Sequence, residues 1–83
     1  MHSTERSSEA REDALRDLPP SAKLVFKVLE YHDALTQSEL ATETLLPQRT
    51  VRDAVSRLEE ADVIESRFSF VDARKRLYSL RVD

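Results

Sequence analysis

The sequence contains no cysteine, no glycine and no tryptophan in its 83 residues. Without cysteine, neither a disulfide framework nor a thiolate metal site can support the fold. The only histidines, His2 and His32, are far apart in the sequence, so we expect no zinc site. The absence of glycine excludes the glycine-rich loops that commonly cradle phosphate groups. No spacing of Ser, His and Asp suggests a catalytic triad, and we expect neither an enzyme nor a bound cofactor.

Long apolar runs are missing as well. No stretch approaches the roughly 20 residues that would span a bilayer. The segment from Met1 to Arg16 is polar and lacks the hydrophobic region of a secretory signal. We therefore expect a cytoplasmic protein with no membrane partner. The length suffices for one small domain, whose marginal core must use most of the apolar residues.

Acidic residues outnumber basic ones, 16 to 13, and the net charge of −3 argues mildly against a nucleic-acid partner. The distribution of charge matters more than its sum. From Ser66 to Asp83, five basic and two acidic residues leave a local charge of +3. Positive charge gathered at one end of a domain is the electrostatic footprint of a nucleic-acid-binding surface.

Residues 1–17 mix Ser, Glu and Arg with little apolar content, which predicts a flexible or partly helical tail. Pro20 then suits the first turn of a helix over about 20–31. Its predicted buried stripe consists of Leu24, Val25, Val28 and Leu29. The apolar residues outside this stripe are candidates for a dimer interface: Leu15, Leu18, Phe26 and Tyr31.

The segment from Thr36 to Glu39 has the spacing of a capping box and predicts a second helix over 37–44. The residue before a proline resists the α conformation, so Pro47 ends that helix by Leu46 and starts a third helix over 47–61. Two short helices joined so closely indicate a helix-turn-helix.

The third helix divides into two faces. Its apolar residues fall within an arc of roughly 120° at the helical period: Val51, Ala54, Val55, Leu58 and Ala61. We expect this face to dock on the core and the other face to stay free. Asp62 should adopt the left-handed conformation that ends the helix, because no glycine is available.

Two strands follow, over 63–70 and 76–82, joined by a polar turn over 71–75. Ile64, Phe68 and Phe70 alternate on one face of the first strand, and Tyr78, Leu80 and Val82 do so on the second, which predicts a β-hairpin. The order of elements therefore predicts an α+β fold over 18–83, a winged helix-turn-helix with three helices and a C-terminal β-hairpin wing.

Several segments carry a family resemblance. Residues 35–41 resemble the start of the second helix of MarR-like regulators, and residues 49–65 resemble their recognition helix and first wing strand. Asp72-Ala73-Arg74 is similar to the Asp-x-Arg motif of their wing, and residues 77–80 to the returning strand. The resemblance implies a winged helix-turn-helix transcription regulator that binds double-stranded DNA.

The sequence departs from that family at two places. Asp62 stands where the family usually has glycine. The family also dimerises through additional terminal helices, and none follows Asp83, so we predict no small-molecule effector at such an interface. Arginine outnumbers lysine ten to three, which fits a regulator of haloarchaeal type and equally fits a GC-rich genome.

The free face of the third helix carries the candidate base-reading residues. Arginine pairs bidentately with guanine, and glutamine with adenine, in the major groove. Asp53 has the helical spacing to orient Arg49 or Arg57. The predicted contacts from this helix are Gln48, Arg49, Thr50, Arg52, Ser56 and Arg57.

The wing supplies Arg74, Lys75 and Arg76, and a basic tip favours a narrow, negative minor groove. The resemblance implies that Arg74 enters this groove. Gln37 and Ser38 begin the second helix, whose N-terminus favours a phosphate. Asp72 has two interpretations, a cap of the wing turn or a functional group.

Three hypotheses remain open. The leading hypothesis is a sequence-specific transcription regulator that acts as a homodimer on a pseudo-palindromic site, because doubling one recognition helix and one wing raises specificity. The arginines could instead lie on a merely solvated face of a winged-helix protein-protein interaction module. A non-specific DNA-coating protein would bind with an affinity that is independent of sequence and falls steeply with salt.

Overall fold

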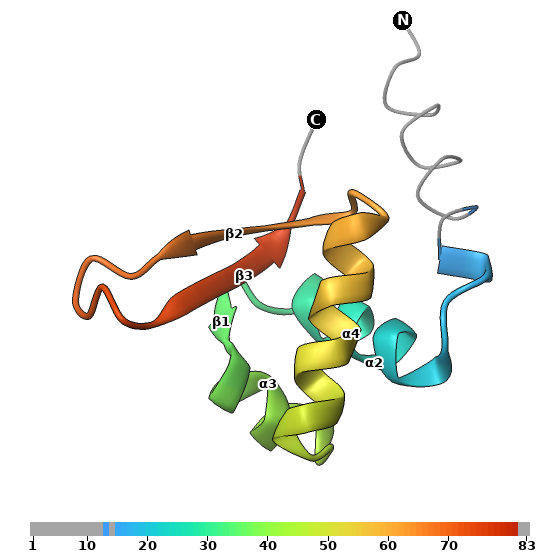
Figure 1. The fold of residues 1–83 in the computed structure, drawn as a ribbon, viewed down its shortest axis with the longest axis horizontal. Coiled ribbons are helices and arrows are strands. Elements are labelled where there is room, and N and C mark those ends of the chain that lie inside the picture. Colours follow the sequence, from blue (N-terminus) through green and yellow to red (C-terminus); the bar gives the residue numbers. More distant parts are fainter. Residues whose placement is uncertain (1–12, 14, 82–83) are drawn as a thin grey trace, which may run out of the picture.

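The computed structural model describes residue 13 and residues 15–81, and it confirms the predicted α+β winged-helix architecture (Figure 1). Residues 1–12, 14 and 82–83, which include most of the predicted tail, lie outside the described residues. No helix in the described part is long and apolar enough to cross a membrane. The elements in chain order are α2 (Pro20–Glu30), β1 (Leu35–Thr36), α3 (Gln37–Thr44), α4 (Gln48–Glu60), β2 (Ile64–Phe68) and β3 (Arg76–Leu80).

The sheet has three antiparallel strands in the order β1-β3-β2. The predicted hairpin is present, with Ile64 opposite Leu80 and Phe68 opposite Arg76. The short extended segment before α3 pairs with β3 on its other side, where Leu35 lies opposite Tyr78. This pairing ties the start of the helix-turn-helix to the wing.

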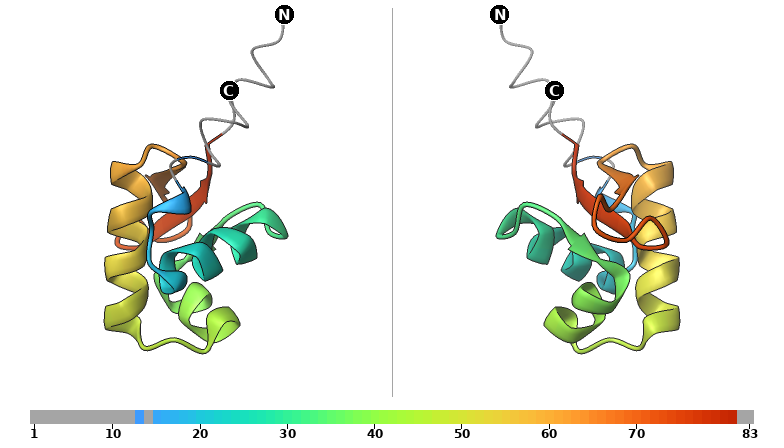
Figure 2. Two further views of the ribbon diagram at one scale, coloured as in Figure 1. Left: turned by 90° about the vertical axis from the view of Figure 1, so that its right-hand side faces the viewer. Right: turned by 90° about the vertical axis from the view of Figure 1, so that its left-hand side faces the viewer.

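Helices α2 and α3 both lie on one side of α4 (Figure 2), and both contact it. The buried residues of α4 are Val51, Ala54, Val55 and Leu58, as the apolar arc predicts. The opposite face of α4 is therefore free of other helices. The protein exposes a helix that is docked by one side only.

The core corrects two predictions about α2. Phe26, expected at a dimer interface, is buried, whereas Leu24, expected in the buried stripe, is 40% exposed. The observed stripe is Ala22, Val25, Phe26 and Leu29. Because α2 must face α3 as well as α4, its buried arc is turned relative to the predicted one, and only Val25 and Leu29 belong fully to both.

The hairpin corrects a third prediction. The alternating pattern placed Ile64, Phe68 and Phe70 on one face of a strand over 63–70, but β2 ends at Phe68, and both phenylalanines are exposed. Ile64 lies next to α4 at the base of the hairpin and is buried, while the far end of the hairpin extends past the helices (Figure 1). Alternation along a strand buries a side chain only where another layer covers the sheet.

Two described residues have positive φ without being glycine, Leu45 at 62° and Asp62 at 64°. Asp62 was predicted in this conformation and also accepts a hydrogen bond from Arg81 at 2.7 Å. Leu45 was not predicted there. It ends α3 in the left-handed conformation with its side chain 89% exposed.

Leu45→Gly should stabilise the domain. The left-handed conformation costs a residue with a Cβ roughly 1–2 kcal/mol, and the greater freedom of glycine when unfolded returns about 0.5–1 kcal/mol of that. We expect the free energy of unfolding to rise by about 0.5–1 kcal/mol, measured by urea denaturation. Ser56→Gly, at an exposed position inside α4, is the control and should be destabilising. Equal losses from both changes would contradict this account.

Candidate nucleic-acid interface

The free face of α4 presents two unengaged guanidinium groups. Arg49 and Arg52 are exposed, and within residues 15–81 neither has an ion pair or a hydrogen bond from its side chain. Ser56, one turn further on, is also exposed, whereas Thr50 is half-buried beside the apolar arc. Long donors that are held on a helix but not satisfied internally are available to an external acceptor.

Arg57, by contrast, is already paired. Its Nε lies 2.9 Å from Oδ2 of Asp53 one turn earlier. The hydrogen bond that Arg57 donates to this carboxylate, together with the carboxylate's charge, raises the pKa of Arg57. Asp53 was expected to orient Arg49 or Arg57, and it engages Arg57. The two arginines nearer the start of α4 are thus the freer pair.

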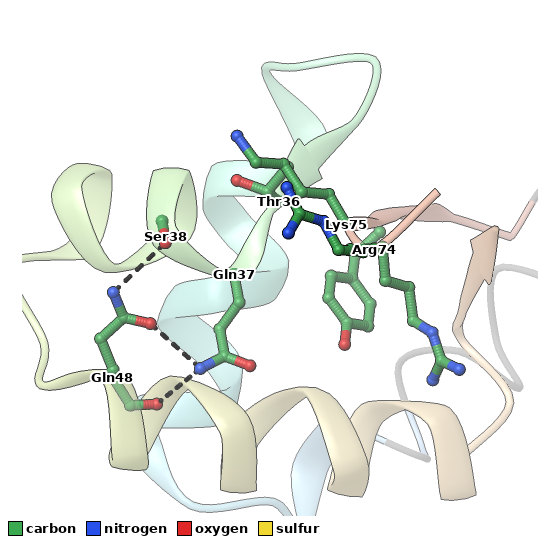
Figure 3. A pocket seen from close by; sticks show the side chains of 8 residues that line it. Thr36, Gln37, Ser38, Gln48, Arg74 and Lys75 are labelled. Carbon is green, nitrogen blue, oxygen red and sulfur yellow. Dashed lines mark hydrogen bonds between the residues drawn. The ribbon is translucent and has the colours of Figure 1, made fainter. Parts of the chain in front are cut away.

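A chain of side-chain hydrogen bonds joins the start of α3 to the start of α4 (Figure 3). Gln37 donates through Nε2 to the side-chain oxygen of Gln48 at 3.1 Å and to its backbone carbonyl at 3.4 Å. Gln48 donates in turn to Oγ of Ser38 at 3.3 Å. Three residues predicted as separate DNA contacts therefore form one hydrogen-bonded unit that links the start of α3 to the start of α4.

The capping box at the start of α3 is complete. The Thr36 hydroxyl accepts from the N–H of Glu39 at 3.2 Å, and the Glu39 carboxylate accepts from the N–H of Thr36 at 2.8 Å. These bonds use two of the donors near the helix start. Since Thr36 also pairs with Leu77 of β3, the cap is anchored to the wing strand.

The wing turn is closed by Asp72. Its Oδ1 accepts from the N–H of Arg74 at 3.0 Å and from Nε of Arg74 at 3.3 Å. The backbone bond first, and then the side-chain bond, lower the pKa of Asp72. The capping interpretation of Asp72 is thus confirmed. The Arg74 side chain is exposed, although its Nε hydrogen-bonds to Asp72.

This geometry predicts an acid transition confined to the wing. Because folding lowers the pKa of Asp72, the stabilisation of the turn is complete above the unfolded pKa of about 3.9 and is lost as the pH falls through the lower folded value. We expect the NMR amide resonance of Arg74 to shift with a midpoint below about 3.9. In Asp72→Asn this shift should vanish. A midpoint at or above the ordinary value would contradict the hydrogen bonding described.

The wing and the helix-turn-helix meet at a surface groove of 290 Å³ (Figure 3). The starts of α3 and α4 form one side, and the basic residues of the wing form the other. The lining residues are Thr36, Gln37, Ser38, Gln48, Arg74, Lys75, Arg76 and Tyr78. Six of the predicted site residues thus come together in one place. Thr36 and Tyr78 could not be predicted in this groove from sequence, because the register of the strands places them there.

Arg76 lies against an aromatic ring. Its guanidinium carbon is 5.2 Å from the centre of the Phe68 ring, directly across the hairpin. Such a contact holds the charge on one face of the strand pair. Arg74 and Lys75 in the turn beyond it are exposed. The wing therefore presents three positive charges: Arg76 against Phe68, Arg74 paired with Asp72, and Lys75 exposed in the turn.

The sequence matches the model of the MarR family over residues 16–75, and the chain belongs to this family. Members of the family are transcription regulators rather than enzymes. A search of curated protein sequences returns no match. The predicted resemblance to MarR-like regulators is confirmed, and the haloarchaeal type stays a prediction.

Solved structures show the same fold. The adhesin competence repressor AdcR of Streptococcus pyogenes is similar, with 24% identity and a TM-score of 0.73, over 80% of this chain and 48% of AdcR. The S. aureus MepR–DNA complex has 19% identity and a TM-score of 0.75, over 95% and 67% of the two chains. The Streptomyces coelicolor regulator PcaV, solved with its natural ligand, has 20% identity and a TM-score of 0.75, over 96% and 60%. The chain thus spans about half the length of AdcR.

Proposed function

We propose that this protein binds double-stranded DNA in a sequence-specific manner as a small transcription regulator. The recognition helix, residues 47–61, enters the major groove, and the wing, residues 70–76, lies on the minor groove. The observation that carries the proposal is the groove shared by the start of α4 and the basic wing. A DNA duplex bound along this surface would contact α4, a helix suited to reading base edges, and also the basic residues of the wing.

The proposed role of each side chain follows from the hydrogen bonds and ion pairs that it makes within the protein. Arg49 and Arg52, which are unpaired within the described part of the chain, read base edges. Gln37, Ser38 and Gln48 set the position of α4, and the spare N–H of Gln48 is left to meet the DNA. The remaining proposed contacts are weaker ones to the backbone or groove wall, from Thr50, Ser56, Arg57, Lys75 and Arg76.

Two further features complete the proposal. The protein acts as a homodimer on a pseudo-palindromic site, since one helix and one wing read few base pairs. Leu24 and Tyr31, exposed on and just after α2, and the half-buried Leu15 and Leu18 are the candidate interface residues. The proposal includes no small-molecule effector. The MepR structure, a complex with DNA, supports the partner, and the PcaV structure shows that a similar protein has a natural ligand.

The test is selection of bound duplexes from a random pool, followed by a salt titration of the winners. We expect a shared sequence motif among the winners and binding that weakens with salt. The triple variant R49A/R52A/R74A should lose this binding, while Lys23→Ala, which removes an exposed charge from α2, should keep it. Binding without sequence preference would favour a DNA-coating protein. No binding by the wild type would favour a protein-protein interaction module.

A further inference from the structure

The tip of the wing carries large apolar side chains in solvent. Phe70 is 102% exposed and Val71 is 97% exposed, and both lie between β2 and β3, where Phe70 was predicted as the end of a strand and Val71 as part of a polar turn. The turn projects away from the helices at the left of Figure 1. No element of the described part covers these side chains. An exposed apolar patch rimmed by polar residues indicates a contact surface.

The apolar tip is held in shape from within. The Ser69 hydroxyl accepts from the N–H of Val71 at 3.1 Å and from that of Asp72 at 3.4 Å. The backbone N–H of Ser69 donates to the carbonyl of Lys75 at 2.9 Å, and the N–H of Lys75 donates to the carbonyl of Asp72 at 2.9 Å. These bonds fix the backbone on both sides of Phe70. A preformed loop loses little entropy on binding, which suits it to insertion into a partner.

The charged residues beside the wing tip indicate which kind of partner the tip contacts. Arg74 and Lys75 are exposed in the same turn, and Arg76 follows directly. A second copy of the wing would bring two such basic clusters together, and the repulsion would oppose contact. The minor groove of DNA has phosphate walls for the cations and apolar sugar and base faces between them. Apolar side chains do act as wedges between base steps in minor grooves.

We propose that Phe70 inserts as a wedge at a base step in the minor groove while Val71 rests against the adjoining sugar. This inference rests on the proposed function and deepens it. Arg74 recognises the negative potential of the groove, whereas Phe70 opens one step and bends the duplex toward the major groove. The site beneath the wing should therefore favour pyrimidine–purine steps, which unstack easily.

The experiment uses the full chain and a duplex selected with the wild type. The fluorescent base 2-aminopurine replaces one base at a time beneath the wing, and its fluorescence rises when it is unstacked. Wild-type protein should raise the fluorescence at one step. Phe70→Ala should abolish the rise and weaken binding about tenfold, as loss of an aromatic–base contact does. The slope of log affinity against log salt should not change, since no charge is lost.

The matched control is Leu45→Ala, which removes another exposed apolar side chain, in the turn between α3 and α4 and outside the wing. It should leave both fluorescence and affinity unchanged. Phe70→Leu should retain part of the rise. If the wild type binds the duplex but leaves every probe stacked, or Phe70→Ala behaves like the wild type, the wedge is wrong and the proposed function stands. If the wild type binds no duplex, both are wrong.

Discussion

Arg52→Ala should weaken binding to the selected duplex by about 5–150-fold, which corresponds to the roughly 1–3 kcal/mol of one bidentate base contact. The guanidinium is exposed on the free face of α4 and has no competing partner within the described residues, so its loss is not compensated. Sequence preference should relax at one base-pair position. Arg49→Ala should have the same effect at a neighbouring position. Competition binding with single-base variants of the duplex measures both.

Arg57→Ala is the control on the same helix. The Arg57 guanidinium is occupied by Asp53 at 2.9 Å, so removing it should change affinity much less and should not relax specificity. Circular dichroism should show all three variants folded, because each residue is exposed. If Arg57→Ala lowered the affinity for DNA as much as Arg52→Ala, with an equal salt dependence, α4 would contribute only positive charge to binding. That result would contradict base reading.

The sequence allowed most of the fold to be predicted because its signals were local. The capping box at Thr36, the proline at 47 and the apolar arc of α4 each depend on residues within a few positions of one another. The bounds of α3 agree with the prediction, and those of α4 differ by one residue at each end. Even the left-handed Asp62 followed from a local requirement, a helix end in a chain without glycine.

Features that depend on contacts between distant segments could not be predicted. The pairing of Leu35 with Tyr78 forms the third strand and places Tyr78 in the groove. Phe26 is buried because α2 faces two helices at once, which no periodicity within α2 reveals. The exposed wing aromatics, conversely, look buried in an alternating pattern because the pattern does not show where the helices end.

The candidate site also has a part that could be predicted from the sequence and a part that only the structure shows. Residue type and helical spacing identified the arginines of α4 and the basic wing, because exposure of a helix face follows from its apolar arc. The engagement of each side chain is a property of the folded surface: Gln48 bonds to Gln37 and Ser38 from another helix, and Arg57 bonds within its own. Only the structure therefore shows which arginine side chains have no partner within the described residues.

The second large effect concerns the core beneath the recognition face. Leu58 is completely buried on the docked side of α4. Leu58→Ala should lower the free energy of unfolding by about 2.7–5 kcal/mol, from lost burial and the cavity left behind. The domain predicted over 18–83 has roughly 3–10 kcal/mol in total at typical values per residue. Urea denaturation followed by circular dichroism measures the loss, which should bring the variant close to unfolding at room temperature.

Leu45→Ala is the matched control, because the same atoms are removed from a residue that is 89% exposed, at the end of α3. Its cost should be well under half that of Leu58→Ala, since less burial and no enclosed cavity are involved. DNA binding separates the two kinds of loss. Leu58→Ala should lose affinity in proportion to the unfolded fraction and regain it when a stabilising osmolyte is added. Arg52→Ala should stay folded and gain nothing from the osmolyte. If both variants recovered alike, the contribution of Arg52 would be to stability, and the assignment of a base contact to it would be wrong.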